Sequence, residues 1–580
     1  MNIKQINHFL AVGSVGCAIG AALAACSDWD DHYAPDAQVL STQGASLWQN
    51  IASDGRLNEF ATLLRQTGYD KVLDAPQAYT VWAPEDGTFD YATLQTTADD
   101  KLKREFIQNH IARSLYPASG NVSERVLMLN NKKMDFAGSG SYTMQNIAVS
   151  RANIAAGNGT LHTISGKIPY KANIYESLNN ETFDIDSISD FYHRYDVRVL
   201  NIEKSVQGPT VDGEITYLDS IMEHDNSLYR LFYSYINRED SSYTMLVPDN
   251  SAWHKAKQAI SQYYNYLPTF ENNDSVAATS KGRIKRVDIN ADYLRDSLVT
   301  LNLLRDLFFN NNMYGNKPLK DLAQGQTVRC DSLCTTTQSK FFATDAARLF
   351  DGATRVEKSN GAIWVTDSLR TPHWISWCPE LRQEAETSSL QAGVFNGSVS
   401  ATYVSAGQQN PNVPGTLSNG RYIEVLPASS SSNPEVAFYL RGVRSTTYVA
   451  YLVTVPANIV NANRAAKPNR LICTVCYTDA KGKLQETRIM NPVDRGTNFI
   501  TDTTRVDTLC LGEVTFPVAY AGLGSSSQPV YPYLRVRSSV NNALSATHDR
   551  TLRFDCLILR PKALDDYLKE HPDYIYDRNN

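Results

Sequence analysis

The sequence predicts a multidomain protein with two α+β domains followed by an all-β sandwich of jelly-roll-like character. The chain has 580 residues, which is too many for one hydrophobic core. An eleven-residue segment occurs twice in its first half, and apolar and polar residues alternate in short runs over its last third. The net charge of −6, with no basic patch that stands out, makes nucleic acid a poor candidate partner.

The repeated segment organises the first two domains. Tyr79–Phe89 reads YTVWAPEDGTF, and Tyr243–Trp253 reads YTMLVPDNSAW. A second pair of motifs follows, because Asn158–Ser165 reads NGTLHTIS and Asn360–Asp367 reads NGAIWVTD. Two motifs that recur in the same order indicate an internal duplication. The aligned residues include Thr80 with Thr244, Pro84 with Pro248, and Asp86 with Asn250.

These motifs resemble those of fasciclin-like domains, in which a strand enters a Pro-acidic turn and an N-G-x-aliphatic-x-hydroxyl strand follows a helical stretch. The resemblance implies two tandem domains, at 45–171 and at 172–373 with an insertion. It also implies adhesion or protein–protein contact as the function. Many members have a Tyr-His pair where this chain has Asn109-His110. The family motif is carried by Thr80, Pro84, Asp86, His110, His162, Thr244 and Pro248.

The first repeat begins with helices. Apolar residues from Ser46 onward recur every three or four positions, with a break at 53–55, and predict two short helices before Tyr69. Tyr79–Ala83 is expected to be a buried strand that Pro84 ends, since proline cannot continue a sheet ladder. Asp86 or Thr88 can then cap the helix that follows.

The rest of the first repeat predicts one long helix and several strands. Asp99–Ser114 reads as a helix, and strands are expected near 126–129 and 133–136. Asn158-Gly159 suits a tight turn because both residues tolerate positive φ. His110 and His162 could meet in one site, or Glu85 and Asp86 could form a carboxylate pair. The alternative is that the histidines are satisfied core residues and the acids are caps.

The second repeat has a longer spacing between its motifs. Its stretch 263–288 contains proline, asparagines and a basic run, and it is expected to be a surface loop. Residues 301–309 match the earlier helix, with Tyr314 in the place of Tyr116. Phe308 then replaces His110 and Trp364 replaces His162, so the second copy lacks both histidines.

The region 374–565 is predicted to be the β-sandwich. Runs such as Tyr448–Val455 and Leu552–Ile558 alternate between apolar and polar faces, which is typical of short sheet strands. Its two ends, 382–386 and 552–561, loosely resemble those of galactose-binding-like or carbohydrate-binding jelly rolls. From Ala563 the chain is expected to form a short helix followed by disorder, and 566–580 is assigned as the tail. Tyrosine rings can stack on sugars, or they can simply pack on sheets; the candidate contacts are Tyr422, Tyr439, Tyr520, Tyr531 and Tyr533.

The N-terminus has the form of an export signal. A basic start precedes the uncharged run 9–23, which ends at Leu-Ala-Ala before Cys26, and 1–25 is therefore predicted to be a signal peptide. The Leu-Ala-Ala-Cys boundary resembles a bacterial lipobox and implies a lipid on Cys26 that anchors the protein in the outer membrane. The alternative is a secretory signal with an incidental cysteine.

An acidic cluster follows the predicted lipid site within a tether at 26–44. It resembles the surface-export signal of Bacteroidetes-type lipoproteins, and it implies that the protein faces the cell exterior. The alternative is a plain solvated tether. The residues of this cluster are Ser27, Asp28, Asp30 and Asp31.

No catalytic, metal or cofactor site is expected. The chain has no G-x-S-x-G, H-E-x-x-H, phosphate-loop or dinucleotide motif, although each would signal a particular chemistry. Cys473 and Cys476 form a C-x-x-C inside a predicted strand, where residues three apart face opposite sides. The sequence therefore indicates a non-enzyme with no metal and no cofactor.

Two functions remain open on these grounds, and a third is disfavoured. The preferred one is a surface-exposed outer-membrane lipoprotein that acts as a binding, adhesion or assembly module. Its resemblance to Bacteroidetes-type lipoproteins implies an accessory role beside a TonB-dependent transporter and lipoprotein pair that imports nutrients. The alternative is a surface glycan-binding protein that holds polysaccharide on its sandwich. A hydrolase is disfavoured by the missing motifs.

Overall fold

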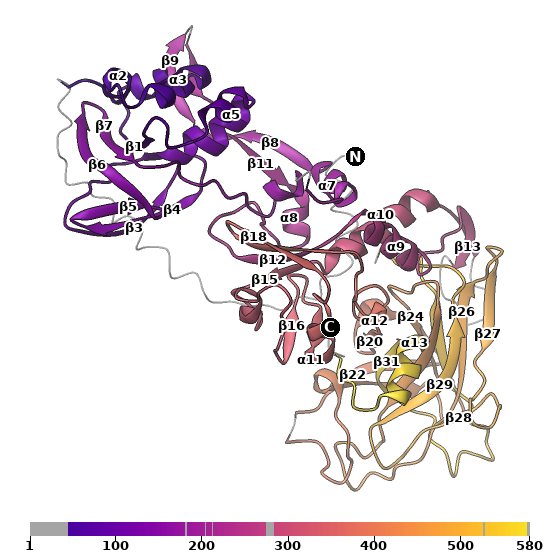
Figure 1. Ribbon diagram of the computed structural model, residues 1–580. Coiled ribbons are helices and arrows are strands. Elements are labelled where there is room, and N and C mark those ends of the chain that lie inside the picture. Colours follow the sequence, from indigo (N-terminus) through magenta and orange to yellow (C-terminus); the bar gives the residue numbers. More distant parts are fainter. Residues whose placement is uncertain are drawn as a thin grey trace.

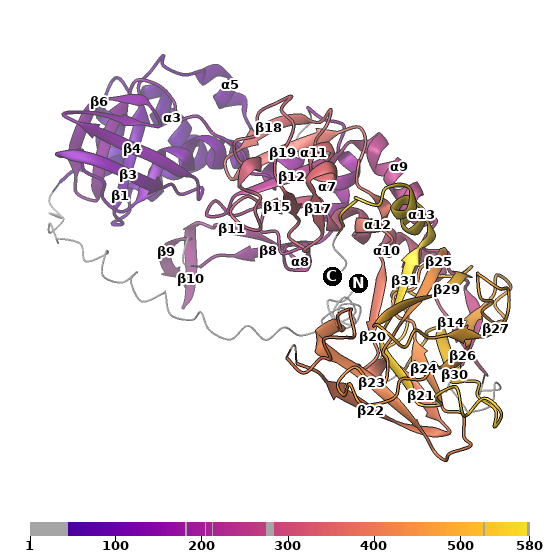
Figure 2. The ribbon, with the colours of Figure 1, turned by 90° about the horizontal axis from the view of Figure 1, so that it is seen from below.

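The computed structural model describes residues 44–576 except 180–181, 203–204, 212, 274–283, 406 and 526–527. The predicted lipid site Cys26 and the cluster of Ser27, Asp28, Asp30 and Asp31 lie outside the described residues. The chain forms three units in a row, which we call the first (44–171), second (172–377) and third (378–576) units (Figure 1). They form an elongated, bent body in both views (Figures 1 and 2).

The first unit wraps helices around one mixed sheet of order β2-β1-β7-β6-β5-β4-β3. Its helices are α2 (Leu47–Ser53), α3 (Asn58–Thr67), α4 (Tyr69–Asp74), α5 (Tyr91–Thr96), α6 (Asp99–Leu102), η1 (Lys103–Ile107) and η2 (Gln108–His110). Its strands are β1 (Tyr79–Pro84), β2 (Ile111–Arg113), β3 (Asn121–Leu127), β4 (Lys133–Ser139), β5 (Ser141–Met144), β6 (Ile147–Ala156) and β7 (Gly159–Ile164).

One expectation for the first unit needs correction. The helix predicted over Asp99–Ser114 ends at His110, and Ile111–Arg113 forms strand β2. Val81 of β1 pairs with Ile111 in an antiparallel register. The apolar residues that suggested a continued helix are therefore part of a short strand at the edge of the sheet.

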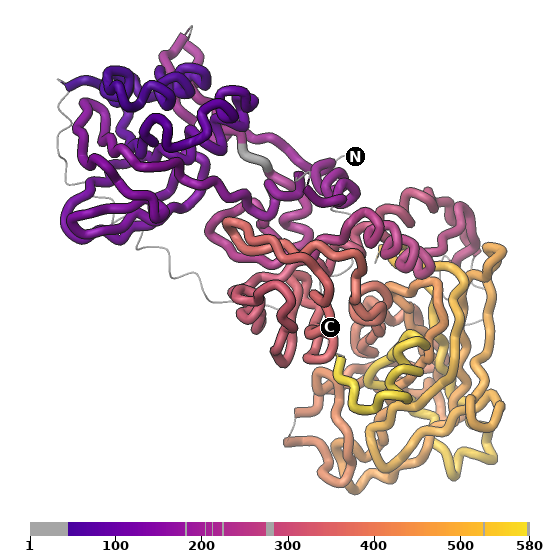
Figure 3. The backbone as a smooth tube through the Cα atoms, in the orientation of Figure 1, coloured from indigo at the N-terminus to yellow at the C-terminus, as the bar shows by residue number. Residues whose placement is uncertain are grey.

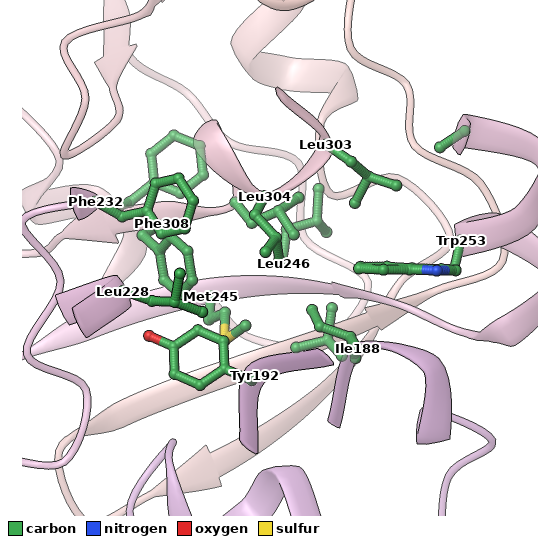
Figure 4. Close-up of a cluster of buried hydrophobic side chains, with 14 of the residues drawn as sticks. Ile188, Tyr192, Leu228, Phe232, Met245, Leu246, Trp253, Leu303, Leu304 and Phe308 are labelled. Atoms are coloured by element: carbon green, nitrogen blue, oxygen red, sulfur yellow. The ribbon is translucent and has the colours of Figure 1, made fainter. Parts of the chain in front are cut away.

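The second unit is built on a four-stranded sheet of order β15-β12-β19-β18. Its helices are η3 (Glu176–Asn179), α7 (Asp186–His193), α8 (Ser227–Leu231), α9 (Asn250–Ser261), α10 (Ala291–Arg305), η4 (Lys317–Leu319), α11 (Ala343–Arg348) and α12 (His373–Ser376). Its sheet strands are β12 (Tyr243–Pro248), β15 (Phe308–Asn310), β18 (Thr354–Lys358) and β19 (Gly361–Thr366). Figure 4 shows part of its core, where Tyr192, Met245, Leu246 and Phe308 are buried together.

The first and second units share one strand arrangement. In the first unit β1 runs parallel to β7, with Tyr79 opposite Gly159 and Pro84 opposite Ile164. In the second unit β12 runs parallel to β19 in the matching register, from Tyr243 opposite Gly361 to Pro248 opposite Thr366. The two sequence motifs are therefore neighbouring strands in both units.

Two-stranded extensions leave the second unit in opposite directions. The strands of one, which we call the arm, are β8 (Asp196–Leu200), β9 (Val206–Val211), β10 (Glu214–Asp219) and β11 (Met222–Asn226). The arm reaches the first unit, where Val206 is buried in its core and Asp219 accepts a 2.5 Å hydrogen bond from the Tyr69 hydroxyl. Lys103 lies 3.5 Å from the same carboxylate. A further short hairpin consists of β16 (Ser332–Cys334) and β17 (Lys340–Phe342).

The other extension corrects the surface loop predicted at 263–288. Within it, β13 (Thr269–Asn273) and β14 (Ile284–Asp288) form a hairpin that lies against the third unit. The Glu271 backbone amide donates to the Gly482 carbonyl at 2.8 Å, and the Asn273 side-chain amide donates to the Tyr533 hydroxyl at 2.5 Å. The polar composition that indicated a loop belongs to a hairpin whose first strand is largely buried against the third unit.

The third unit consists of two facing sheets with a hydrophobic core between them. One sheet contains β20 (Leu381–Glu384), β22 (Gly397–Tyr403), β23 (Arg421–Pro427), β25 (Thr447–Thr454), β29 (Asp507–Thr515) and β31 (Leu552–Pro561). The other contains β21 (Gln391–Phe395), β24 (Glu435–Tyr439), β26 (Arg470–Thr478), β27 (Leu484–Arg488), β28 (Phe499–Ile500) and β30 (Tyr533–Ser538). Its remaining helices are η5 (Ser388–Leu390), η6 (Ser418–Gly420) and α13 (Lys562–Glu570).

The C-terminal segment packs back onto the body of the protein (Figure 3). The Tyr574 hydroxyl donates to the Asp345 carboxylate at 2.6 Å and accepts from the Trp374 indole at 3.1 Å. The expected helix is present and begins at Lys562. The disorder expected after it is wrong as far as Tyr576, whose hydroxyl donates to Glu380.

The chain is thus a multidomain, β-rich protein. Among the residues that the structure describes, no helix combines the length and apolar character that crossing a membrane requires.

Candidate functional site

The asparagine of the first N-G motif fastens three separate backbone segments. The Leu47 amide donates to Asn158 Oδ1 at 2.7 Å. The Asn158 side-chain amide donates to the carbonyls of Leu73 and Ala75 at 2.8 and 2.7 Å. These bonds hold α2 and the end of α4 against the start of β7, so Asn158 has a structural role in the first unit.

The asparagine of the second N-G motif makes the equivalent contacts. Its Oδ1 accepts from the Ile174 amide at 2.9 Å, and its side-chain amide donates to the carbonyls of Ile236 and Arg238 at 2.7 and 3.0 Å. Asn360 therefore ties the opening of the second unit to its sheet in the way that Asn158 does in the first.

The glycines of the two motifs are required by close backbone approach. A Cβ on Gly159 would lie 2.1 Å from the Tyr79 carbonyl oxygen, and one on Gly361 would lie 1.8 Å from the Tyr243 carbonyl oxygen. A tight turn was expected to explain Asn158-Gly159, but the turn alone does not explain the glycine. The neighbouring parallel strand leaves no room for a side chain at this position.

Asp86 and its counterpart Asn250 accept hydrogen bonds at the start of an earlier helix, α3 in the first unit and α7 in the second. Asp86 accepts from the backbone amides of Asn58 and Glu59, at 3.0 and 2.9 Å, at the start of α3. Asn250 accepts from the Ser187 amide at 2.8 Å, at the start of α7. The expectation that Asp86 or Thr88 caps the following helix is wrong, because the cap of α5 is Asp90, which accepts from the Thr93 amide.

The other motif residues also act inside the scaffold. The Thr80 hydroxyl donates to the Ser114 carbonyl at 2.8 Å, and the Thr244 hydroxyl donates to Asn311 Oδ1 at 2.8 Å. Pro84 and Pro248 are the last residues of β1 and β12. Glu85 accepts from Ser150 and Thr163, and it does not pair with Asp86, whose bonds go to α3.

His110 is buried and fully bonded to the backbone. Its Nδ1 lies 2.7 Å from the Phe106 carbonyl, and its Nε2 accepts from the Ile168 amide at 2.9 Å. Burial lowers the pKa of His110 to about 4, which makes the ring neutral at physiological pH.

His162 lies in a different cluster, stacked on Trp82 with ring centroids 5.5 Å apart. Its Nε2 lies 2.9 Å from the Tyr116 carbonyl, and burial lowers its pKa. The two histidines therefore form no joint site, and both behave as satisfied core residues.

The strand register also corrects one assignment in the second unit. Val81 faces Ile111 across β1 and β2, whereas the equivalent Met245 faces Phe308. Phe308 therefore corresponds to Ile111 and not to His110, and Tyr314 is displaced from Tyr116 by the same single residue. Trp364 does correspond to His162, because it lies opposite Leu246 as His162 lies opposite Trp82.

Most of the tyrosines proposed as sugar contacts have no open face. Tyr422, Tyr520, Tyr531 and Tyr533 are all buried, so their rings are unavailable for stacking in this structure. Tyr439 is half-buried and packs edge-on against Tyr531, with ring centroids 5.7 Å apart. These predictions depended on exposure, and alternation along a strand cannot reveal exposure when loops or hairpins cover both sides of a sheet.

A charged groove lies on the outward face of the third unit's second sheet. It has a volume of about 510 Å³ and crosses β24, β30, β26 and β27. Alternation along these strands points Val436, Cys473 and Leu534 into the core, which turns the intervening residues outward. The lining residues are Glu435, Ile472, Thr474, Glu486, Arg488, Arg535 and Arg537.

Arg535 occupies the centre of one side of this groove. It is 6% exposed and donates to Glu435 at 2.6 Å and to Glu486 at 3.2 Å. Desolvation raises the pKa of Glu486, whereas the charge of Arg535 acts in the opposite direction. Sequence reasoning did not identify these groove residues. Arg535 and Arg537 alternate with apolar residues along the strand, a pattern that indicates charge on one face of the sheet.

A second polar cluster lies where β20 meets β31. The ligand atoms of Glu384, Asp555 and Cys556 lie within 4.8 Å of one another. Asp555 is fully buried, and one oxygen each of Asp555, Glu384 and Glu386 has no hydrogen-bond partner. Burial, with help from the two glutamates, raises the pKa of Asp555 to about 7.

These donors suit a hard cation better than zinc. Carboxylate oxygens are the ligands that calcium and magnesium prefer, whereas burial raises the pKa of the Cys556 thiol and keeps it in the protonated, poorly ligating form. Sequence reasoning could not group these residues because Glu384 and Asp555 come from opposite ends of the unit.

The seven cysteines of the described chain are all free thiols. Cys473 and Cys476 face opposite sides of β26, since Cys473 packs in the main core and Cys476 in a separate cluster beside Tyr533. Burial raises the pKa of both thiols, as expected for apolar core residues.

Comparison with known proteins identifies one family within the chain. The model of the Fasciclin domain matches residues 55–168. None of the curated proteins compared with the chain matches it.

Solved structures show more distant likenesses. The FAS1 domain pair of the insect cell adhesion molecule Fasciclin I is 14% identical, covers 56% of this chain and 99% of its own, and has a TM-score of 0.19. A xylan-binding domain from CBM 22 is 11% identical, covers 31% of this chain and 93% of its own, and scores 0.18. A Paenibacillus xanthan lyase is 13% identical, covers 36% of this chain and 17% of its own, and scores 0.20. The family match, which agrees with the motifs and their geometry, places a Fasciclin domain at residues 55–168 of this multidomain chain.

Proposed function

We propose that the protein is a non-catalytic binding and assembly module, lipid-anchored through Cys26 on the outer face of the outer membrane. In this proposal the second unit is a second fasciclin-like domain, and the third unit is a jelly-roll-like sandwich. The repeated strand register and the paired roles of Asn158 and Asn360 support the tandem. A Fasciclin domain favours adhesion-like contact over catalysis.

The observation that carries the proposal is a buried ion cluster between the first two units. Lys132 of the first unit is 2% exposed. Its ammonium group donates to Glu176 at 2.7 Å and to Glu239 at 2.6 Å, both in the second unit. The Ser359 hydroxyl lies 3.2 Å away. A buried lysine with two carboxylate partners fixes geometry, because separating the units would leave unpaired charges.

The second and third units are joined just as closely. Tyr266 donates to the Ala521 carbonyl at 2.6 Å, and buried Arg444 donates to the Tyr264 hydroxyl at 3.2 Å. Ala519, Ala521 and Leu523 of the third unit belong to the core of the second. Such joints suit a stiff spacer that holds its binding surfaces at fixed positions.

The expected partner is a TonB-dependent transporter with its companion lipoprotein. Mild detergent extraction, affinity capture of the tagged protein and mass spectrometry test this directly. We expect the transporter in the eluate from wild-type cells and its loss from cells that express the Cys26→Ala variant. Recovery of the protein alone from wild-type membranes would contradict the assembly role.

The groove of the third unit supports an alternative function, a surface glycan-binding protein. Its volume of about 510 Å³ lies in the range of ordinary ligand sites, and it opens on the outward face of a sheet at the far end of the molecule. A glycan array with the intact protein tests this alternative. Absence of any bound glycan, with the transporter still captured, would leave the assembly role standing alone.

A further inference from the structure

The charged groove contains two arginines that are not used by the fold. Within the described part of the chain, the side chains of Arg488 and Arg537 make no recorded hydrogen bond or ion pair, although Arg488 acts electrostatically on Glu486. Both residues are exposed. Arg535, in contrast, is bound by Glu435 and Glu486. The groove thus holds one neutralised guanidinium and two that are open to a ligand.

The strand register brings these two arginines to the same stretch of the groove. Arg488 lies opposite Thr474 on one side of β26, and Arg537 lies opposite Ile472 on the other side. Their backbones are separated by two strand spacings across the sheet and by two residues along it, or about 12 Å in all. Side chains that flank a central strand in this way can approach one ligand from both sides.

The lining also limits which ligands fit. None of the seven lining residues is aromatic, so this groove offers no ring on which a neutral sugar could stack. Glu435 and Glu486 can accept hydrogen bonds, and they would repel an anionic group placed directly against them. The combination favours a ligand with separated negative charges and many hydroxyl groups. Arginine forms bidentate, charge-assisted bonds to carboxylates, and the glutamates can accept from hydroxyls.

We propose that this groove binds a carboxylate-bearing polysaccharide, with Arg488 and Arg537 holding a uronate carboxylate and Glu435 and Glu486 accepting from sugar hydroxyls. The proposal rests on the glycan-binding alternative above and names its ligand class. It gives the groove selectivity for acidic over neutral glycans, because a neutral chain would leave both guanidinium groups without a partner.

The test uses the intact protein and matched polymers. Polygalacturonate, alginate and hyaluronan are each compared with their carboxyl-reduced forms in affinity electrophoresis and titration calorimetry. We expect at least one acidic polymer to bind, its reduced form to bind at least tenfold more weakly, and its affinity to fall as salt screens the charges.

Single variants locate the site. Arg488→Gln and Arg537→Gln should each weaken binding about tenfold, the loss expected for one charge-assisted hydrogen-bonded contact. Arg421→Gln is the matched control, since Arg421 is an exposed arginine on β23 of the other sheet, and it should bind as wild type. All three positions are exposed, and an unchanged melting temperature confirms that each variant is folded.

The outcomes separate this proposal from the function on which it rests. Equal binding of acidic and carboxyl-reduced polymers, or unaltered binding by both groove variants, would overturn the proposal. Binding of neutral polymers alone would also overturn it while leaving the glycan-binding function intact. If no polymer of either kind binds, the acidic-glycan proposal and the glycan-binding function both fail. Capture of a transporter would then support the assembly role.

Discussion

Replacing Lys132 tests whether the first two units form one rigid body. The Lys132→Met variant keeps most of the side-chain volume but removes the ammonium group that Glu176 and Glu239 share at 2.7 and 2.6 Å. Two carboxylates, whose side chains are 21% and 9% exposed, then lose the counter-charge that they share. Breaking a buried pair from one side costs about 3–5 kcal/mol.

The lost stability should appear as weaker contact between the first and second units. We expect the melting temperature of the first transition to fall by roughly 10 °C, since 1 kcal/mol shifts a domain of this size by about 2–4 °C. Small-angle scattering should show a broader distribution of distances between the units, and limited proteolysis should cut the connection near residue 171 sooner.

The neighbouring lysine provides the matched control. Lys133 lies on β4 and is half-buried, and no ion pair is recorded for it among the described residues, so Lys133→Met should change little. Adding Glu176→Gln and Glu239→Gln to Lys132→Met should restore much of the lost stability by removing the unpaired charges. A Lys132→Met protein that melts and scatters as wild type would refute the reasoning.

Three further predictions concern the anchor, its export and the carboxylate cluster. Cys26→Ala should move the protein out of the membrane fraction, and pelleting with outer membranes after a carbonate wash would argue against lipidation. Replacing Asp28, Asp30 and Asp31 together with alanine should leave lipidation intact but protect the protein from protease added to whole cells; unchanged cleavage would reduce the cluster to a tether. Asp555 has its pKa raised to about 7 by burial, above about 3.9 in an unfolded chain. Its stabilising contribution is therefore complete below pH 4 and is lost as the pH rises through 7, a fall of up to about 4 kcal/mol. Urea unfolding should show this fall in wild type, a flatter profile in Asp555→Asn, and recovery at pH 8 when calcium is added.

Local patterns predicted the scaffold of the first two units well. The strand Tyr79–Ala83, the break between α2 and α3 and the correspondence of Trp364 to His162 were all predicted from short sequence motifs. The observed strand runs one residue further, to Pro84. Asn158 and Asn360 could be located in the same way, but their bonds to distant carbonyls could not, because those partners come from segments with no sequence signal.

The candidate site was much harder to predict. The groove requires Glu435, Arg488 and Arg537 from three strands, and only the sheet order brings them together. The buried tyrosines failed as predictions because burial depends on neighbouring segments: the hairpin β13–β14 that reaches Tyr533 was itself expected to be a loop. The arm, too, was not foreseen, since its exposed valines and isoleucines resemble ordinary core strands.

Cross-linking mass spectrometry on intact cells tests the central claim most directly, namely that a stiff, non-catalytic body presents its surfaces to an outer-membrane partner. We predict cross-links from this protein to a TonB-dependent transporter or its lipoprotein, together with links between the first and second units that match the joint around Lys132. Links confined to this protein alone, or a spread of unit-to-unit distances that one arrangement cannot satisfy, would contradict the account.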